Sequence, residues 1–198
     1  MFGKFLFYSI ELCLVFLILT YFSIRIWLIA RFDDVVKDRP YTEFVQAINS
    51  TPPLPQQLFD AYARVYNFDE RKTTNFFLVE IPWRSLSFRY QNTMCPCTRV
   101  NYPLVQNPWD RLTIGLALDR DVGSIKCMEY HLNTFDFLHS QIGVRNASSF
   151  YFGKELEDLS ETEFLTLCII MKNPSSYDPF RHPDNVRREL LKILHNSQ

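Results

Sequence analysis

The sequence predicts a mostly α-helical protein in which one N-terminal membrane-spanning helix precedes a single soluble domain. Three observations predict this class: an apolar run at the start of the chain, helical spacing of apolar side chains in most of the remainder, and the stretch 164–171, which is apolar on nearly every face of a helix. The 198 residues, 47% of them hydrophobic, suffice for one membrane segment and one domain with a sizeable core.

Residues 1–31 are predicted to form an uncleaved membrane anchor. The run from Phe5 to Ile24 is long enough to cross a bilayer of about 30 Å at about 1.5 Å per residue. A cleaved signal peptide is the alternative, but the run exceeds the usual apolar core of about 7–15 residues and no small-x-small cleavage site follows it. Basic residues flank the run on both sides, so charge alone does not assign its orientation.

Glu11 is the unusual residue of this segment. A carboxylate within a bilayer is costly unless it is protonated, paired or close to the head groups. Two interpretations stay open: a shallow or protonated acid, and a contact with a basic residue of another membrane helix. Arg25 lies nearly four helical turns away, too far to pair within one helix.

Residues 32–53 are predicted to be a juxtamembrane connector, and residues 54–198 the folded domain. Within the connector, residues 41–49 have helical spacing that the proline-rich stretch after Thr51 ends.

In the domain, residues 58–66 are predicted to form a helix. Residues 76–90 could form a short strand or a broken helix, because Pro82 interrupts a run of aromatic and β-branched residues.

The C-terminal half is predicted to be helical throughout. Helices are expected over residues 111–119 and 124–135, and Pro183 should open a last helix that ends near His195. Another helix should begin after Ser160, because Glu163 three residues later completes a capping box. Since residues 164–171 of that helix offer no polar face, they should lie at the centre of the domain.

Composition excludes some functions. The formal net charge of −1 gives no general attraction to nucleic acid, so no nucleic-acid partner is expected. Cys95 and Cys97 are too close in sequence to pair with ordinary disulfide geometry. With four dispersed histidines they also make a weak ligand pattern, and neither a metal site nor a cofactor is predicted.

Ordered motifs in the last third of the chain carry the functional information: Glu-Tyr-His-Leu-Asn at 129–133, Gly-Val at 143–144, Ala-Ser at 147–148, Tyr-Phe-Gly-Lys at 151–154 and Pro-Ser-Ser-Tyr-Asp-Pro at 174–179. In this order and spacing the chain resembles the C-terminal half of the family 51 glycosyltransferases, membrane-bound enzymes that polymerise lipid II into peptidoglycan. The resemblance covers roughly residues 54–190 and is specific from about Leu118. The matched positions are mainly fold-defining, with glycines for close packing or positive φ, prolines for turns and aromatics for the core.

The resemblance implies a lysozyme-like transglycosylase domain on the periplasmic side of the bacterial inner membrane, with lipid II or peptidoglycan as its ligand. It also implies two catalytic glutamates, one that removes a proton from the acceptor hydroxyl and one that assists departure of the pyrophosphate, often with a divalent metal.

Neither glutamate is found where the family pattern falls. The first falls on Tyr66, followed by Asn67, and the second on Arg111, or with a small gap on Thr113 or Ile114. A Gly-x-Ser-Thr-x-x-Gln-Gln motif falls on residues 92–97, where Thr93 matches and a proline replaces a glutamine. The tyrosine of Glu-Leu-Tyr-Leu-Asn is His131 here, which we interpret as a packed residue rather than a proton carrier.

We therefore expect an inactive pseudoenzyme, a membrane-anchored relative that binds glycan, lipid II or an envelope protein. An alternative is an active transferase with relocated acids, Glu70 or Asp69 as the base and Glu80 or Asp119 assisting.

Candidate ligand-binding side chains are Arg64, Arg111 and Thr93. Residues 69–72 could also be only the solvated, charged end of a helix. A third hypothesis makes the protein a subunit or immunity-type partner of an envelope complex, in view of Glu11 and Arg25 in the membrane segment and the aromatic residues of 76–90.

Overall fold

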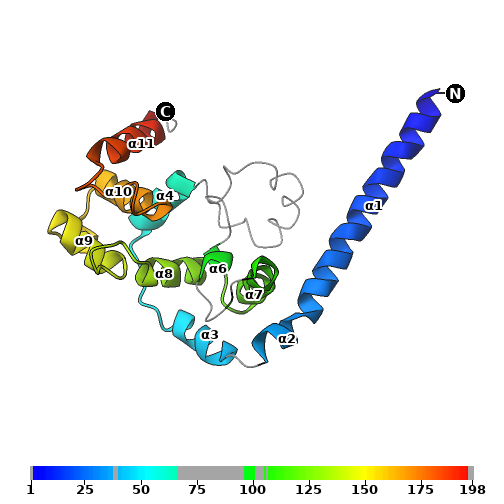
Figure 1. Cartoon of the computed structure of the whole chain (residues 1–198), viewed down its shortest axis with the longest axis horizontal. Helices are drawn as coiled ribbons and strands as arrows, with labels where there is room; N and C mark the ends of the chain where they lie inside the picture. Colours follow the sequence, from blue (N-terminus) through cyan, green and yellow to red (C-terminus); the bar gives the residue numbers. More distant parts are fainter. Residues whose placement is uncertain (1, 38–39, 67–95, 101–104, 106, 196–198) are drawn as a thin grey trace.

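The computed structural model describes residues 2–37, 40–66, 96–100, 105 and 107–195, and within these ranges the regular elements are helices (Figure 1). They are α1 (Phe2–Ala30), α2 (Phe32–Val36), α3 (Tyr41–Asn49), α4 (Gln56–Tyr66), α6 (Pro96–Arg99), α7 (Pro108–Asp121), α8 (Ser124–Thr134), α9 (Val144–Phe152), the 3-10 helix η2 (Leu156–Asp158), α10 (Glu161–Lys172) and α11 (Pro183–His195). The predicted mostly α class is confirmed.

Helix α1 extends away from the body formed by the other helices (Figure 1). The segment Tyr8–Val36 contains a window with a mean hydropathy of 2.3, of which 6% is buried. By length and composition this helix can cross a bilayer.

The C-terminal end of α1 packs on α7. Leu28 is fully buried against Leu112, and the indole rings of Trp27 and Trp109 meet edge to face at 5.8 Å. Directly after α1, the Arg31 guanidinium donates to a carboxylate oxygen of Asp110 at 2.7 Å. A cation and aromatic rings at one end of an apolar helix are typical of the membrane–water boundary.

Two hydrophobic clusters form the core of the described body. The smaller one, here called the membrane-side cluster, joins α2, α3, α6, α7 and α8. Its buried members are Val35, Phe44, Ile48, Cys97, Val100, Val105, Ile114, Leu118 and Cys127.

A disulfide between Cys97 and Cys127 ties α6 to α8 inside this cluster. The segment 32–53, predicted as a connector, contributes three buried side chains to the same cluster and so packs on the body. The domain boundaries at residues 31 and 53 stay a prediction.

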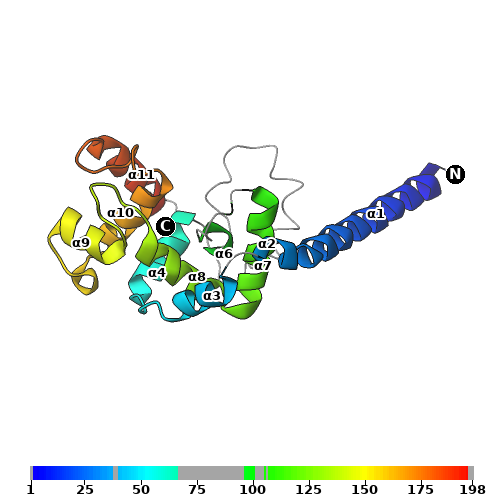
Figure 2. The ribbon, with the colours of Figure 1, turned by 60° about the horizontal axis from the view of Figure 1, so that its bottom comes forward.

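The larger, C-terminal cluster joins α4 to α8, α9, α10 and α11. Helix α10 lies among its neighbours in both views of the ribbon (Figures 1 and 2). Every residue from Phe164 to Met171 is buried, which confirms the prediction that this apolar stretch forms the centre of the fold. The capping box of Ser160 and Glu163 at its start is present as predicted.

Two matched glycines have physical reasons to be glycine. Gly143 has a φ of 85°, and a Cβ there would lie 2.5 Å from the carbonyl oxygen of Asn133. Gly153 ends α9 in the left-handed region with a φ of 65°. Both therefore serve the scaffold, as expected from the motifs.

Helix bounds differ from the prediction by a few residues. Helix α7 begins at Pro108, three residues before the predicted start, because the Asn107 side chain accepts a hydrogen bond from the Trp109 amide at 2.9 Å. The Asn-Pro pair, with an N-cap and proline at the first helical position, is the sequence signal for this start.

Candidate functional site

The family's catalytic base is predicted from the sequence to fall on Tyr66, which is the last residue of α4. Its side chain is 2% exposed and its hydroxyl donates to the carbonyl oxygen of Cys168 on α10 at 3.1 Å. Burial raises the pKa of Tyr66 well above its usual range, and the neighbouring Tyr62 adds to the rise. The phenol is therefore protonated at neutral pH and does not act as a general base.

Arg99 lies beside this tyrosine and also acts on His131 of α8. The Arg99 guanidinium sits over the Tyr66 ring, 4.9 Å from its centroid. Burial lowers the pKa of His131 to about 3, and the positive charge of Arg99 adds to the effect. His131 is thus neutral at pH 7, and its ring packs edge to face on Phe135 at 5.5 Å. This agrees with the interpretation of His131 as a packed residue.

The positions of the second glutamate lie on α7. Arg111 is exposed, and its Nε donates to the carbonyl oxygen of Val105 at 3.4 Å. Thr113 and Ile114 are each 2% exposed, and Ile114 belongs to the membrane-side cluster. These three positions offer a cation, a hydroxyl and an apolar side chain.

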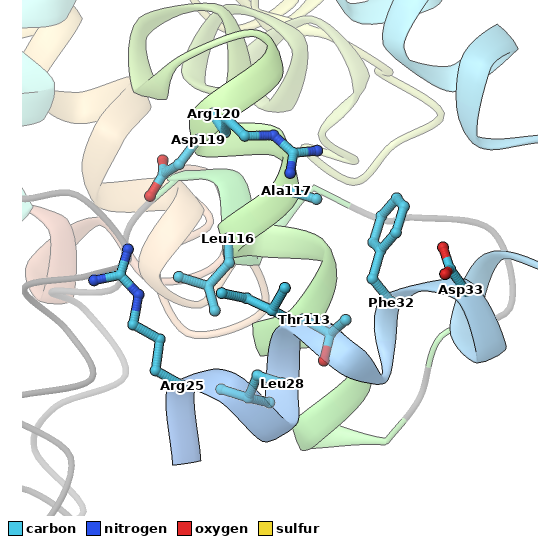
Figure 3. Close-up of a pocket in the computed structure, with 10 residues that line it drawn as sticks. Arg25, Leu28, Phe32, Asp33, Thr113, Leu116, Ala117, Asp119 and Arg120 are labelled. Carbon is cyan, nitrogen blue, oxygen red and sulfur yellow. The ribbon is translucent and has the colours of Figure 1, made fainter. Parts of the chain in front are cut away.

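Asp119 lies one to two turns further along α7 and lines a cavity of about 550 Å³ between α1, α2 and α7 (Figure 3). Arg25 and Arg120 line the same cavity. Of the acids proposed for a relocated active site, Asp119 is the one that the structure describes. Asp69, Glu70 and Glu80 lie outside the described residues, as do Thr93 and the stretch 76–90.

Arg64, a candidate ligand-binding residue, projects from α4 and pairs with Glu161 at the start of α10. It therefore contributes to the contact between two helices of the C-terminal cluster. The structure does not bring Arg64 into the cavity that Asp119 lines. The ligand-binding roles of Arg64, Arg111 and Thr93 stay predictions.

The carboxylate of the Glu-Tyr-His-Leu-Asn motif is buried and paired. Glu129 is 5% exposed and accepts from the Lys126 ammonium group at 2.6 Å. In the Tyr-Phe-Gly-Lys motif, Lys154 donates to Glu163 at 2.8 Å and so braces the capping box of α10. The hydrogen bond that Lys154 donates to Glu163, with a second from the Ser160 amide, lowers the pKa of Glu163 to about 2.

Asp178, in the Pro-Ser-Ser-Tyr-Asp-Pro motif, has no exposed surface. It accepts from the Phe180 amide at 2.9 Å and bonds to the His139 Nε2 at 2.9 Å. Burial raises the pKa of Asp178, but these hydrogen bonds outweigh it and hold the pKa below its usual range. Each matched motif residue with a polar side chain discussed here thus holds the scaffold together.

Within the described part of the chain, no group of three or more histidine, cysteine, aspartate or glutamate side chains is placed to hold a metal ion. Sequence reasoning missed the partner of Cys97, because Cys127 lies 30 residues away and nothing in the spacing links the two.

Comparison with known proteins places the C-terminal part of the chain in a family. Residues 105–198 match the model of the Transglycosylase family. Penicillin-binding protein 1F of Bacillus subtilis (strain 168) is 39% identical over 87 residues, which cover 43% of this chain and 12% of that protein.

Two further relatives match the chain over stretches of similar length. Penicillin-binding protein 4 of Bacillus subtilis (strain 168) is 32% identical over 83 residues, 42% of this chain and 13% of that protein. Penicillin-binding protein 1A of Aquifex aeolicus (strain VF5) is 34% identical over 80 residues, 39% of this chain and 11% of that protein. The chain thus spans a small part of each relative. Its residues 105–198 match a transglycosylase domain of glycosyltransferase family 51, as the C-terminal motifs predicted, and the helical structure agrees with the lysozyme-like fold of that domain.

Proposed function

We propose that this protein is a membrane-anchored, non-catalytic relative of the peptidoglycan glycosyltransferases that binds a glycan strand or lipid II outside the cytoplasm. The observation that carries the proposal is Tyr66. The side chain in the place of the base is buried, protonated and hydrogen-bonded to the backbone of α10. An acceptor hydroxyl is a poor nucleophile at pH 7 unless a base takes its proton.

The second reacting group is missing in the same way. Arg111, Thr113 and Ile114 provide no carboxylate that could assist departure of a pyrophosphate. In contrast, motif residues in the C-terminal part of the chain make hydrogen bonds and ion pairs within the fold. A scaffold kept intact around altered reacting positions favours a binding role over turnover.

Two features support an anchor with the domain in an oxidising compartment. Helix α1 has the length and composition to span a bilayer. The Cys97–Cys127 disulfide is of a kind that persists outside the cytoplasm, in the periplasm or at the cell surface. We therefore place the body on the outer side of the inner membrane, an orientation that the flanking charges alone leave open.

Polymerisation of fluorescent lipid II by the full chain in detergent tests the proposal, with and without a divalent metal and beside an active transglycosylase of the family. We expect no polymer from this protein, and binding of lipid II without its consumption. Polymer formation that is lost in Glu70→Gln, Asp69→Asn, Glu80→Gln or Asp119→Asn would establish the alternative, an active transferase with relocated acids. An exposed control, Asp184→Asn, reports non-specific effects.

An envelope protein partner is the second candidate, because the polar side chain of Glu11 lies on an exposed face of α1. Site-specific photo-crosslinking from positions next to Glu11 in intact membranes tests this role. A single product that disappears in Glu11→Gln favours a partner helix, and its absence favours glycan or lipid II.

A further inference from the structure

The cavity between α1, α2 and α7 has features of a binding site that the proposed function does not use. Its volume is about 550 Å³, and its charged lining is Arg25, Asp33, Asp119 and Arg120 (Figure 3). Apolar side chains, among them Leu28, Phe32 and Leu116, complete the walls.

The position of the cavity, at the end of the apolar run of α1, indicates a lipid ligand. It is lined by the last two turns of α1, and Arg25 directly follows the apolar run that ends at Ile24. If α1 is the anchor, on which this inference rests, the cavity opens where the hydrocarbon of the bilayer meets the head groups.

Arg25 supplies a cation that forms no ion pair within the described part of the chain, although Asp33 and Asp119 line the same cavity. Its side chain is half-buried, and it makes no hydrogen bond or ion pair with the residues that the structure describes. The Arg120 guanidinium, in contrast, is held by Asp121 at 2.6 Å. A half-buried guanidinium without a partner favours a bound anion, and a phosphate matches its planar set of donors.

Thr113 is a second, independent indication that the cavity binds a ligand. It lines the cavity and is 2% exposed, and its hydroxyl oxygen is the buried side-chain atom without a hydrogen-bond partner among the described residues. A buried hydroxyl left unpaired is costly, and a threonine in a helix can take either of two χ1 rotamers. A ligand oxygen in the cavity would give this hydroxyl a partner.

The balance of charge indicates which head group fits. Two arginines and two aspartates sum to zero, so a purely anionic ligand gains little from the cavity as a whole. Asp33, at the start of α2, is exposed and has no partner among the described residues. It can accept hydrogen bonds from a primary ammonium group.

We propose that the cavity binds one glycerophospholipid with an ethanolamine head group. The phosphate lies against Arg25 and the Thr113 hydroxyl, and the ammonium group lies against Asp33. The acyl chains run along the exposed apolar surface of α1. A lipid in this position would fill the space between the anchor and α7 and so fix the body relative to the membrane.

Native mass spectrometry of the full chain, purified in a mild detergent and titrated with phosphatidylethanolamine, tests the proposal. We expect one tightly bound lipid per protein. Arg25→Gln should weaken its binding about tenfold and Thr113→Val about threefold, because each removes one phosphate contact. Arg187→Gln, an exposed arginine on α11, should leave binding unchanged.

Three outcomes would overturn the assignment: equal binding of the lipid by Arg25→Gln, tighter binding of phosphatidylglycerol than of phosphatidylethanolamine, or saturation by inorganic phosphate alone. Thermal unfolding checks that each variant is folded, and Thr113→Val keeps the shape of the side chain. The bound lipid is read as mass, so a lipid II polymerase activity would refute the proposed function and leave this result intact. Membrane fractionation tests the anchor separately.

Discussion

The two core clusters differ in how they are held together. The C-terminal cluster surrounds a helix, α10, whose residues from Phe164 to Met171 are all buried; four of its helices follow one another in sequence from α8 to α11, and α4 joins them from earlier in the chain. The membrane-side cluster is smaller, draws on α2, α3, α6 and α7, and contains a disulfide. Helix α8 contributes to both clusters.

The two clusters also differ in which positions of the family pattern they contain. The matched motifs lie in and around the C-terminal cluster, where burial and hydrogen bonds constrain each side chain. Of the predicted positions of the two glutamates, Tyr66 on α4 is buried in the C-terminal cluster, whereas those on α7 include Ile114 of the membrane-side cluster and the exposed Arg111. This contrast indicates that the scaffold and the reacting groups changed separately, since fold and chemistry depend on different residues.

Removal of the disulfide should have the largest effect and should act on the membrane-side cluster. Replacing Cys97 and Cys127 with serine should lower the free energy of unfolding by about 3–4 kcal/mol, because the cross-link closes a loop with a sequence separation of 30. Denaturant unfolding measures the loss, and hydrogen exchange should locate it in α3 and α6. Cys13→Ser, on the exposed face of α1, is the control. Equal exchange in both clusters would contradict the distinction between them.

Acid should lower the free energy of unfolding through His131, which lies on α8, the helix that contributes to both clusters. Its pKa of about 3 in the folded protein lies below the value of about 6.5 expected in the unfolded chain. The unfolded state therefore takes up a proton first, and stability is lost as the pH falls from about 6.5 towards 3, by up to about 1.4 kcal/mol per pH unit.

Replacing His131 with tyrosine, the residue that the family resemblance gives at this position, should flatten this dependence between pH 6.5 and 5. Thermal unfolding over that range measures it. A slope that is the same in His131→Tyr and in His195→Gln, a control at the end of α11, would exclude His131 as its source.

Tyr66→Phe tests the contact between α4 and α10. Loss of the hydrogen bond to the Cys168 carbonyl should cost about 1 kcal/mol while the ring stays packed under Arg99. Denaturant unfolding measures the change, and lipid II binding should be unaffected. A gain in stability would show that the hydroxyl is not satisfied by α10.

The smallest effect is expected at the capping box of the C-terminal cluster. Glu163→Ala should cost about 1 kcal/mol at pH 7, and Glu163→Gln should cost less, because glutamine can still cap the Ser160 amide.

The pKa of Glu163, about 2, is depressed relative to the unfolded chain, so its contribution is present above about pH 4.3 and is lost as the pH falls towards 2. Thermal unfolding at pH 6 and pH 2.5 should show a smaller acid effect in Glu163→Gln than in the natural chain. An equal acid effect would contradict the ion pair with Lys154.

The sequence was sufficient to predict α4, α8, α10 and α11 of the C-terminal cluster, but not α9, because the predicted helices carry local signals. The capping box predicted the start of α10, Pro183 predicted the start of α11, and the run from Phe164 to Met171 predicted full burial. These signals depend on neighbours within one or two helical turns.

The disulfide, the packing of α3 and the cavity were not predicted, because each depends on residues far apart in the chain. Cys97 meets Cys127, and Thr113 lies near Leu28, only after the helices have packed. Of the candidate site, sequence reasoning predicted that no carboxylate stands at the family's reacting positions, but it did not reveal the contact of Arg99 with Tyr66.

The most direct test of the central claim is an experimental structure of the full chain with a non-hydrolysable lipid II analogue bound. The account predicts the Tyr66 hydroxyl on the Cys168 carbonyl, and no carboxylate within hydrogen-bond reach, about 2.6–3.2 Å, of the acceptor hydroxyl. Glu70, Asp69 or Glu80 at that distance from the acceptor would contradict it.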